Sequence, residues 1–186
     1  MLNFVSKNIK KVGLFVAVLL LAALVLCFIR FFKPCAVPLR YVQDAVYILT
    51  VLAGFEYTFG GFKKNAAKSY KLFMLLACLE CVLLLIYDMI SSTGDGQQDS
   101  VSAVLEMANC VNIFILTFSK NLGKDSSVGL GCAVLGVTVV NSVRLLILYP
   151  DNFVVVSRAV MSLALSSLIC LFILAKYADK AKRNTN

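Results

Sequence analysis

The chain has 186 residues, of which 60% are hydrophobic and 15% charged, and its mean hydropathy is +0.87. A composition this apolar is incompatible with a water-exposed globular surface, so a soluble domain is excluded. Histidine and tryptophan are absent, which excludes histidine-based triads, zinc sites and proton relays. We therefore expect an all-α, polytopic integral membrane protein.

Six segments are expected to cross the membrane as helices, since a span takes about 20 mostly apolar residues. The second, fourth and fifth contain internal polar residues but keep enough Leu, Val, Ile and Phe to cross within a bundle. Lysines precede the first segment as in a signal peptide, but no A-x-A site follows it, so we expect a retained helix. The connections are short, which predicts a single membrane domain over residues 1–186 with spans at 13–32, 41–62, 70–90, 101–119, 127–149 and 153–177.

Basic residues gather on one side of these expected spans. The side that holds both termini contains Lys7, Lys10, Lys11, Lys63, Lys64, Lys68, Lys71, Lys120, Lys124, Lys176, Lys180, Lys182 and Arg183. Loops 91–100 and 149–152 on the other side contain Asp but no Lys or Arg. The positive-inside bias then places both termini in the cytoplasm. Arg30, Lys33 and Arg40 are exceptions, so either the first outer loop interacts with anions or lipid head groups, or the first two spans are misassigned.

The formal net charge of +8 follows from this topology and from attraction to anionic lipid, so the lipid bilayer is the expected partner and nucleic acid is not. The small size and the lack of an Asn-x-Ser/Thr site favour a bacterial plasma membrane. Six of the seven cysteines lie within expected spans, so no structural disulfide is expected. We interpret Cys78-x-x-Cys81 as small apolar core residues, because no second pair accompanies it.

Ionisable residues at bilayer depth are energetically costly and suggest functional sites. They are Asp44, Glu56, Glu80, Asp88, Glu106, Arg144 and Arg158. All except Glu56 and Glu80 fall in the outer leaflet of the expected topology. Three of them, Asp44, Asp88 and Arg158, are close enough to the interface to be snorkelling helix ends.

Polar residues recur on three consecutive spans, with three-residue steps on the fourth and fifth. They predict an outward-facing pocket lined by Glu80, Glu106, Asn109, Asn112, Asn141 and Arg144. Amide groups both donate and accept hydrogen bonds, and Arg144 suits a carboxylate or phosphate, so we expect a small polar or anionic solute. In the alternative interpretation, the same side chains only hold the helices together.

Glu56 and Glu80 have no basic residue at their own depth in the expected bundle. A carboxyl group there needs a proton, a bound cation or a distant arginine. This favours a role with a coupling ion or a proton, although Glu56 could instead pair with Lys63 or Lys64.

Small residues one helical turn apart let two backbones approach closely. Such pairs are Gly13 and Ala17 in the first span and Gly129 and Ala133 in the fifth. Packing within the chain explains both pairs, but a terminal helix is also free to meet a partner. Gly13 and Ala17 are therefore the candidate contact with a partner membrane subunit.

The sequence contains no nucleophile beside a base and no Walker or dinucleotide-binding glycine pattern. We therefore expect no enzyme activity, no cofactor and no metal site. The first functional hypothesis is a small membrane solute-binding or transport subunit. The alternative is a non-catalytic accessory or assembly protein whose polar residues are structural.

The expected architecture is similar to that of the substrate-binding subunits of energy-coupling factor vitamin transporters. The shared features are a mass of 20.3 kDa, six spans, internal termini, a basic start to the first helix and an outward pocket. The resemblance covers the whole chain and implies that Gly13 and Ala17 contact a transmembrane coupling subunit. It also implies a ligand near the outer ends of the later helices. Those subunits usually carry a longer loop after the first span, which caps the site. In this chain only about ten residues connect Phe32 to Asp44.

Overall fold

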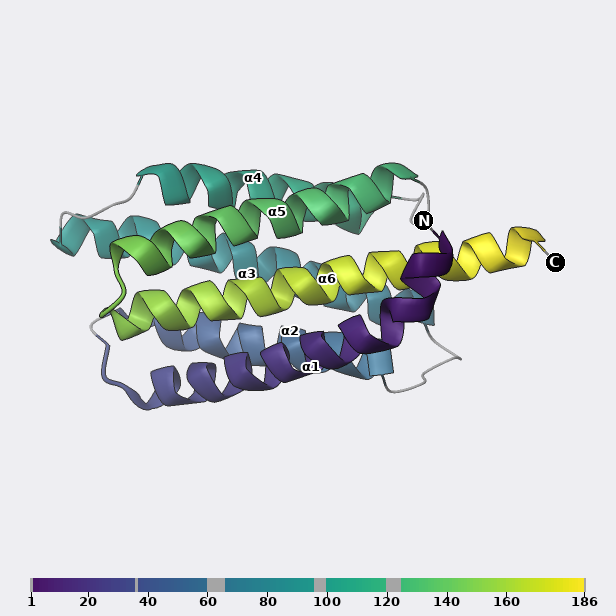
Figure 1. The fold of residues 1–186 in the computed structure, drawn as a ribbon. Helices are drawn as coiled ribbons and strands as arrows, with labels where there is room; N and C mark the ends of the chain where they lie inside the picture. Colours follow the sequence, from purple (N-terminus) through teal and green to yellow (C-terminus); the bar gives the residue numbers. More distant parts are fainter. Residues whose placement is uncertain (1, 36, 60–65, 96–99, 120–124, 186) are drawn as a thin grey trace.

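The computed structural model describes residues 2–35, 37–59, 66–95, 100–119 and 125–185. These residues form helices and no strand, which confirms the all-α prediction (Figure 1). The helices are α1 (Leu2–Phe32), α2 (Leu39–Phe59), α3 (Ala66–Asp95), α4 (Ser100–Phe118), α5 (Asp125–Leu148) and α6 (Phe153–Thr185).

The helix boundaries follow from local chemistry. Pro34 and Pro38 lie in the connection between α1 and α2, where a missing amide hydrogen breaks no helical hydrogen bond. Asn152 precedes α6, and its Oδ1 accepts hydrogen bonds from the amides of Val154 and Val155 at 3.1 and 3.3 Å. It thereby caps two amides that the first turn of the helix leaves without intrahelical partners.

Three helices extend beyond the spans predicted from the sequence. α1 begins at Leu2, α3 continues to Asp95 and α6 continues to Thr185. Residues 91–95, predicted to lie in an outer loop, are therefore helical. A helix satisfies its own backbone hydrogen bonds, so it continues past the apolar part of the sequence into a polar environment.

Within the residues that the structure describes, four helices are long and apolar enough to cross a membrane. Their candidate spans are Lys11–Phe32 in α1, Val101–Phe118 in α4, Asp125–Leu148 in α5 and Phe153–Ala175 in α6. Large apolar side chains cover the outside of the bundle, such as Leu14, Phe15 and Leu21 on α1. This surface is unfavourable in water and suits contact with lipid, as expected of a membrane protein.

Each helix packs against the next one along the chain, and α6 also packs against α1, so the helices close into a ring. α6 is the most enclosed of the four candidate spans, because 61% of its span is buried against 28–33% in the other three. Helices α1, α3 and α5 run away from one end of the bundle, and α2, α4 and α6 run back toward it (Figure 1). Leu2 and Thr185 therefore lie at the same end, which we call the terminal end.

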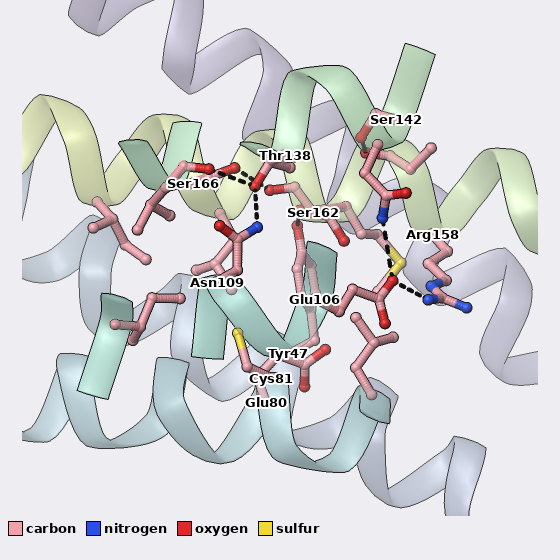
Figure 2. Close-up of a pocket in the computed structure, with 18 of the residues that line it drawn as sticks. Tyr47, Glu80, Cys81, Glu106, Asn109, Thr138, Ser142, Arg158, Ser162 and Ser166 are labelled. Carbon is pink, nitrogen blue, oxygen red and sulfur yellow. Dashed lines mark hydrogen bonds and ion pairs between the residues drawn. The ribbon is translucent and has the colours of Figure 1, made fainter. Parts of the chain in front are cut away.

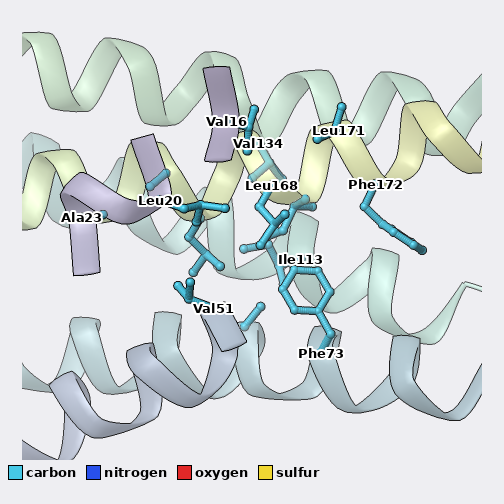
Figure 3. Close-up of a cluster of buried hydrophobic side chains, with 14 of the residues drawn as sticks. Val16, Leu20, Ala23, Val51, Phe73, Ile113, Val134, Leu168, Leu171 and Phe172 are labelled. Atoms are coloured by element: carbon cyan, nitrogen blue, oxygen red, sulfur yellow. The ribbon is translucent and has the colours of Figure 1, made fainter. Parts of the chain in front are cut away.

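The apolar core lies between α6 and the inner faces of the surrounding helices (Figure 3). On α1 the inner face repeats at steps of three and four residues, as an amphipathic helix requires. Its buried members are Val16, Leu20, Ala23, Cys27 and Arg30. From the other helices, Phe73 and Phe172 meet edge to face with ring centroids 6.4 Å apart. The core therefore joins α1 and α3 through α6.

Gly54 marks the closest approach of α2 to this core. A Cβ atom at Gly54 would lie 2.6 Å from Leu168 Cδ2 and 2.6 Å from Phe73 Cε2, and both of these side chains are buried. Neither has free space to move into, because protein interiors are close-packed. The position therefore requires glycine.

We expect Gly54→Ala to lower the free energy of unfolding by about 1–3 kcal/mol through overpacking. Gly136→Ala is the matched control, because a Cβ atom there meets nothing within 4 Å and alanine favours helix by about 0.5–1 kcal/mol. Thermal unfolding in detergent measures both variants. Equal melting temperatures would contradict the close packing of α2 against α6.

Candidate functional site

A polar cavity of about 50 Å³ lies inside the bundle, and side chains from all six helices line it (Figure 2). Its polar lining includes Arg30, Gln43, Glu80, Glu106, Asn109, Thr138, Asn141 and Arg158. By comparison, a buried water needs about 10–15 Å³ measured in this way. The cavity therefore has room for a few water-sized groups.

Helical periodicity directs these side chains inward. On α4 the residues Ser102, Glu106 and Asn109 follow at steps of four and three residues, which keeps them on one face. On α6, Arg158, Ser162 and Ser166 follow at steps of four residues, and all three line the cavity. The polar face of each helix thus points into the ring while its apolar face points outward.

One side of the cavity is formed by the Arg30 cluster, which consists of Arg30, Gln43, Asp44 and Glu80. Arg30 donates hydrogen bonds from Nε and Nη2 to Asp44 Oδ1, with the Nε contact at 2.8 Å. Arg30 Nη2 also donates to Gln43 Oε1 at 2.8 Å, and Gln43 Nε2 donates to Glu80 Oε1 at 3.0 Å. Arg30 and Asp44 are both completely buried. A chain of polar contacts therefore leads from α1 through α2 to α3.

A second group of polar residues, the Glu106 cluster, consists of Ser102, Glu106, Asn141, Arg144 and Arg158. Its members Glu106, Asn141 and Arg158 line the other side of the cavity. Arg158 donates to Glu106 Oε1 and forms an ion pair with it. Asn141 Nδ2 donates to the same oxygen at 3.4 Å, and Ser102 Oγ donates to Asn141 Oδ1 at 2.8 Å. Arg144 Nη1 donates to Ser102 Oγ at 3.4 Å. This cluster joins α4, α5 and α6.

Further hydrogen bonds, made by residues outside the two clusters, hold the cavity walls in place. Asn109 Nδ2 donates to Thr138 Oγ1 at 2.8 Å, and Thr138 Oγ1 donates to the Val134 carbonyl at 2.8 Å. Tyr47 Oη on α2 donates to the Met161 carbonyl on α6 at 3.0 Å, across the interior. The walls are therefore held by polar contacts as well as by apolar packing.

The structure brings four of the six predicted pocket residues together. Glu80, Glu106, Asn109 and Asn141 line the cavity. The half-buried Arg144 does not line it but reaches its edge through Ser102.

The other predicted residues lie elsewhere. Asn112 is half-buried on α4 and does not line the cavity. On α1, Gly13 is buried within the chain and Ala17 is half-buried, so their contact with a partner subunit stays a prediction.

Several residues named in the sequence predictions lie outside the described part of the chain. Residues Lys63, Lys64, Lys120 and Lys124 lie outside the described residues, and so do the side chains of Lys7, Lys10, Glu56, Lys68, Asp88 and Lys176. The pairing of Glu56 with Lys63 or Lys64 therefore stays a prediction.

The interpretation of Asp44 and Arg158 as snorkelling helix ends is wrong. The Asp44 side chain is 0% exposed and that of Arg158 is 14% exposed, and each forms an ion pair inside the bundle. Arg30, which pairs with Asp44, was not among the predicted site residues. Arg30 lies two residues before the end of α1 and Asp44 five residues after the start of α2. Opposite charges on either side of a short helix connection are the sequence signal for this pair.

The basic residues near the connection between α1 and α2 make contacts within the protein. Arg30 forms the buried ion pair with Asp44, and Arg40 Nη2 donates to the carbonyls of Arg30 and Lys33 at the end of α1. The Arg30 carbonyl also accepts a hydrogen bond from the Lys33 amide at 3.1 Å. Carbonyls in the last turn of a helix lack the usual i+4 amide partner, so Arg40 acts as a cap at this end. Lys33 Nζ lies 3.8 Å from the centroid of the Phe153 ring. Each of these three basic side chains therefore makes a contact within the protein.

The seven cysteines are free thiols. Among the described residues, no group of three or more Cys, Asp and Glu side chains could hold a metal ion.

No family model, curated protein or solved structure matches the chain. The site is therefore interpreted from its own geometry.

We expect Asp44→Leu to lower the free energy of unfolding by about 3–5 kcal/mol, because it leaves the Arg30 guanidinium buried without a counter-charge. The double variant Arg30→Met with Asp44→Leu removes both charges and should recover much of this loss. Thermal unfolding in detergent compares the two. Equal destabilisation in the single and double variants would show that the two residues are not coupled.

Proposed function

We propose that this chain is a membrane transport subunit that binds a small polar solute in the cavity between the Arg30 and Glu106 clusters. The observation that carries the proposal is the convergence of polar side chains from six helices on one buried cavity. Intramembrane polar residues that face a common interior usually mark a substrate or ion pathway. The proposal assigns no chemical reaction to the chain.

The proposed topology has all six helices crossing a bacterial plasma membrane, with the terminal end in the cytoplasm. α2 and α3 run alongside the other four helices (Figure 1), and both expose large apolar side chains, including Leu49 and Leu52 on α2 and Leu72 and Ile86 on α3. In this proposed topology, thirteen of the 18 Lys and Arg residues fall on the cytoplasmic side. The positive-inside bias supports this orientation.

The lining determines the kind of solute. Arg158 and Asn141 carry hydrogen-bond donors. Glu80 and Glu106 are acceptors when ionised, and Asn109 offers its Oδ1 as a further acceptor because its amide nitrogen donates to Thr138. A solute with both donor and acceptor groups suits this lining better than a simple anion. The volume of about 50 Å³ limits a solute bound in this conformation to on the order of four non-hydrogen atoms. A larger solute would require the helices to separate.

The alternative function is that of an accessory or assembly protein with a structural polar interior. The hydrogen bonds from Asn109 to Thr138 and from Ser102 to Asn141 favour this alternative, because each links neighbouring helices. Such bonds stabilise helix pairs by about 0.6 kcal/mol on average. The two functions differ in whether any small molecule binds.

The topology predicts which exposed positions a membrane-impermeant maleimide reaches in intact cells. Asp151→Cys, in the exposed turn before α6, should be labelled without permeabilisation. Lys11→Cys, exposed near the terminal end of α1, should be labelled only after permeabilisation. Wild-type protein is the control for labelling of native cysteines. The reverse pattern would invert the orientation, and labelling of both in intact cells would contradict the count of spans.

The solute proposal predicts a retained small-molecule mass in native mass spectrometry of gently extracted protein. Asn141→Leu should lose this mass, because Asn141 lines the cavity and donates to Glu106. Asn112→Leu is the matched control and should keep it, since Asn112 lies outside the lining. If wild-type protein carries no small molecule and Asn141→Leu only lowers the melting temperature, the accessory function is supported instead.

A further inference from the structure

Glu80 is a carboxyl group near the middle of the bundle with one uncommitted oxygen. Its side chain lines the cavity, and the residue is only 4% exposed. Oε1 accepts a hydrogen bond from Gln43, whereas Oε2 is fully buried and has no hydrogen-bond partner among the described residues. Buried polar atoms are nearly always satisfied in native proteins, so Oε2 calls for an explanation.

The direction of the Gln43 hydrogen bond is fixed by Arg30. Arg30 is only a donor, so the Gln43 oxygen must face it and the Gln43 amide hydrogens must face Glu80. Glu80 Oε1 is therefore an acceptor, and any proton on this carboxyl group lies on Oε2. The unpartnered oxygen is thus the atom at which the charge of Glu80 must be neutralised.

The basic groups near Glu80 are committed to other carboxylates. Arg30 forms an ion pair with Asp44, and Arg158 forms one with Glu106. Charged and titratable groups that face Glu80 or share its cavity are Cys27 and Arg30 on α1, Asp44 and Tyr47 on α2, Cys81 on α3, Glu106 on α4 and Arg158 on α6. The two ion pairs cancel, so Glu80 is the carboxylate in this set that lacks a counter-charge. An ionised carboxylate is strongly disfavoured in such a buried position.

Asn109 supplies a second uncommitted oxygen to the same cavity. Thr138 Oγ1 donates its own hydrogen to Val134, so it can only accept from Asn109. The Asn109 nitrogen is therefore directed at Thr138, and its Oδ1 is buried without a partner in the described part of the chain. Carboxylate and amide oxygens are the groups that bind hard cations.

We propose that Glu80 Oε2 binds a monovalent cation, either a proton or Na⁺, inside the cavity, and that Asn109 Oδ1 is a second ligand when the cation is Na⁺. Either cation neutralises the buried carboxylate at Oε2, and Na⁺ would also occupy Asn109 Oδ1. Its binding does not require the solute, so this site is testable by itself. In a transport subunit it would be the site of the coupling ion.

Infrared spectroscopy of the full chain in lipid nanodiscs distinguishes the two cations. The first spectrum is recorded at pH 7 in choline chloride, and the second after exchange into NaCl. If the ligand is a proton, the wild type shows the carbonyl band of a protonated carboxylic acid in both salts. If the ligand is Na⁺, the band is absent from the spectrum recorded in NaCl. The melting temperature is then higher in NaCl than in choline chloride, by about 5–10 °C at an Na⁺ concentration of roughly 100 times the Kd.

Variants assign the signal to Glu80. Glu80→Gln should abolish both the band and the Na⁺-specific stabilisation, whereas Asp151→Asn, which alters an exposed carboxyl group, should keep the wild-type response. Asn109→Ala should raise the Kd for Na⁺ about tenfold or, if the ligand is a proton, leave the band intensity unchanged. The proposal is overturned if the wild type shows neither the protonated band nor stabilisation by NaCl over choline chloride. It is also overturned if a folded Glu80→Gln variant keeps the wild-type response.

Discussion

The buried ion pair between Arg30 and Asp44 is the constraint on which the polar interior depends. A guanidinium with no exposure to water must be matched by a carboxylate, because an unpaired charge in a low-dielectric interior is very costly. The pair fixes how α1 lies against α2. Through Arg30 it also sets the orientation of Gln43, and Gln43 in turn directs its amide hydrogens at Glu80. The state of the central carboxyl group thus depends on an arginine located on another helix.

The second ion pair, between Arg158 and Glu106, joins helices that are not consecutive in the chain. Arg30 and Asp44 join helices that follow one another in the chain, whereas Arg158 and Glu106 join α6 to α4, which are separated in the chain by α5. The hydrogen bond from Tyr47 to the Met161 carbonyl likewise crosses the interior, from α2 to α6. These contacts hold opposite walls of the ring together, and the cavity lies between them (Figure 2). A polar interior of this kind holds the helices together and also leaves space at their centre.

Much of this arrangement was predictable, and the failures have a geometric cause. Long apolar segments with short connections predict a helical bundle, and polar residues on one helical face predict a shared interior. Three-residue steps, however, rotate each successive side chain backwards by about 60°. Asn112 and Arg144, each the last member of such a series, point about 120° away from the first, and both lie outside the lining. Arg30 and Arg158 are not predicted as site residues because proximity to a helix end suggests exposure. Asp44 lies just across a short connection from Arg30, whereas Glu106 is 52 residues from Arg158 and meets it only in the folded structure.

The balance between structural and ligand-binding roles differs among the polar residues. Arg30 and Asp44, Asn109 and Thr138, and Ser102 and Asn141 each form direct contacts, which stabilise the bundle without any ligand. A purely structural interior would be expected to satisfy all of its polar atoms in this way. Several buried atoms depart from this expectation among the described residues, including Arg30 Nη1 and Asp44 Oδ2 of the ion pair itself. Glu80 Oε2 and Asn109 Oδ1 are acceptor oxygens on two side chains that line the cavity, and the other polar atom of each side chain is held by a neighbour. Their orientation is therefore imposed by their neighbours, and the two oxygens are kept available for a group that the protein itself does not supply.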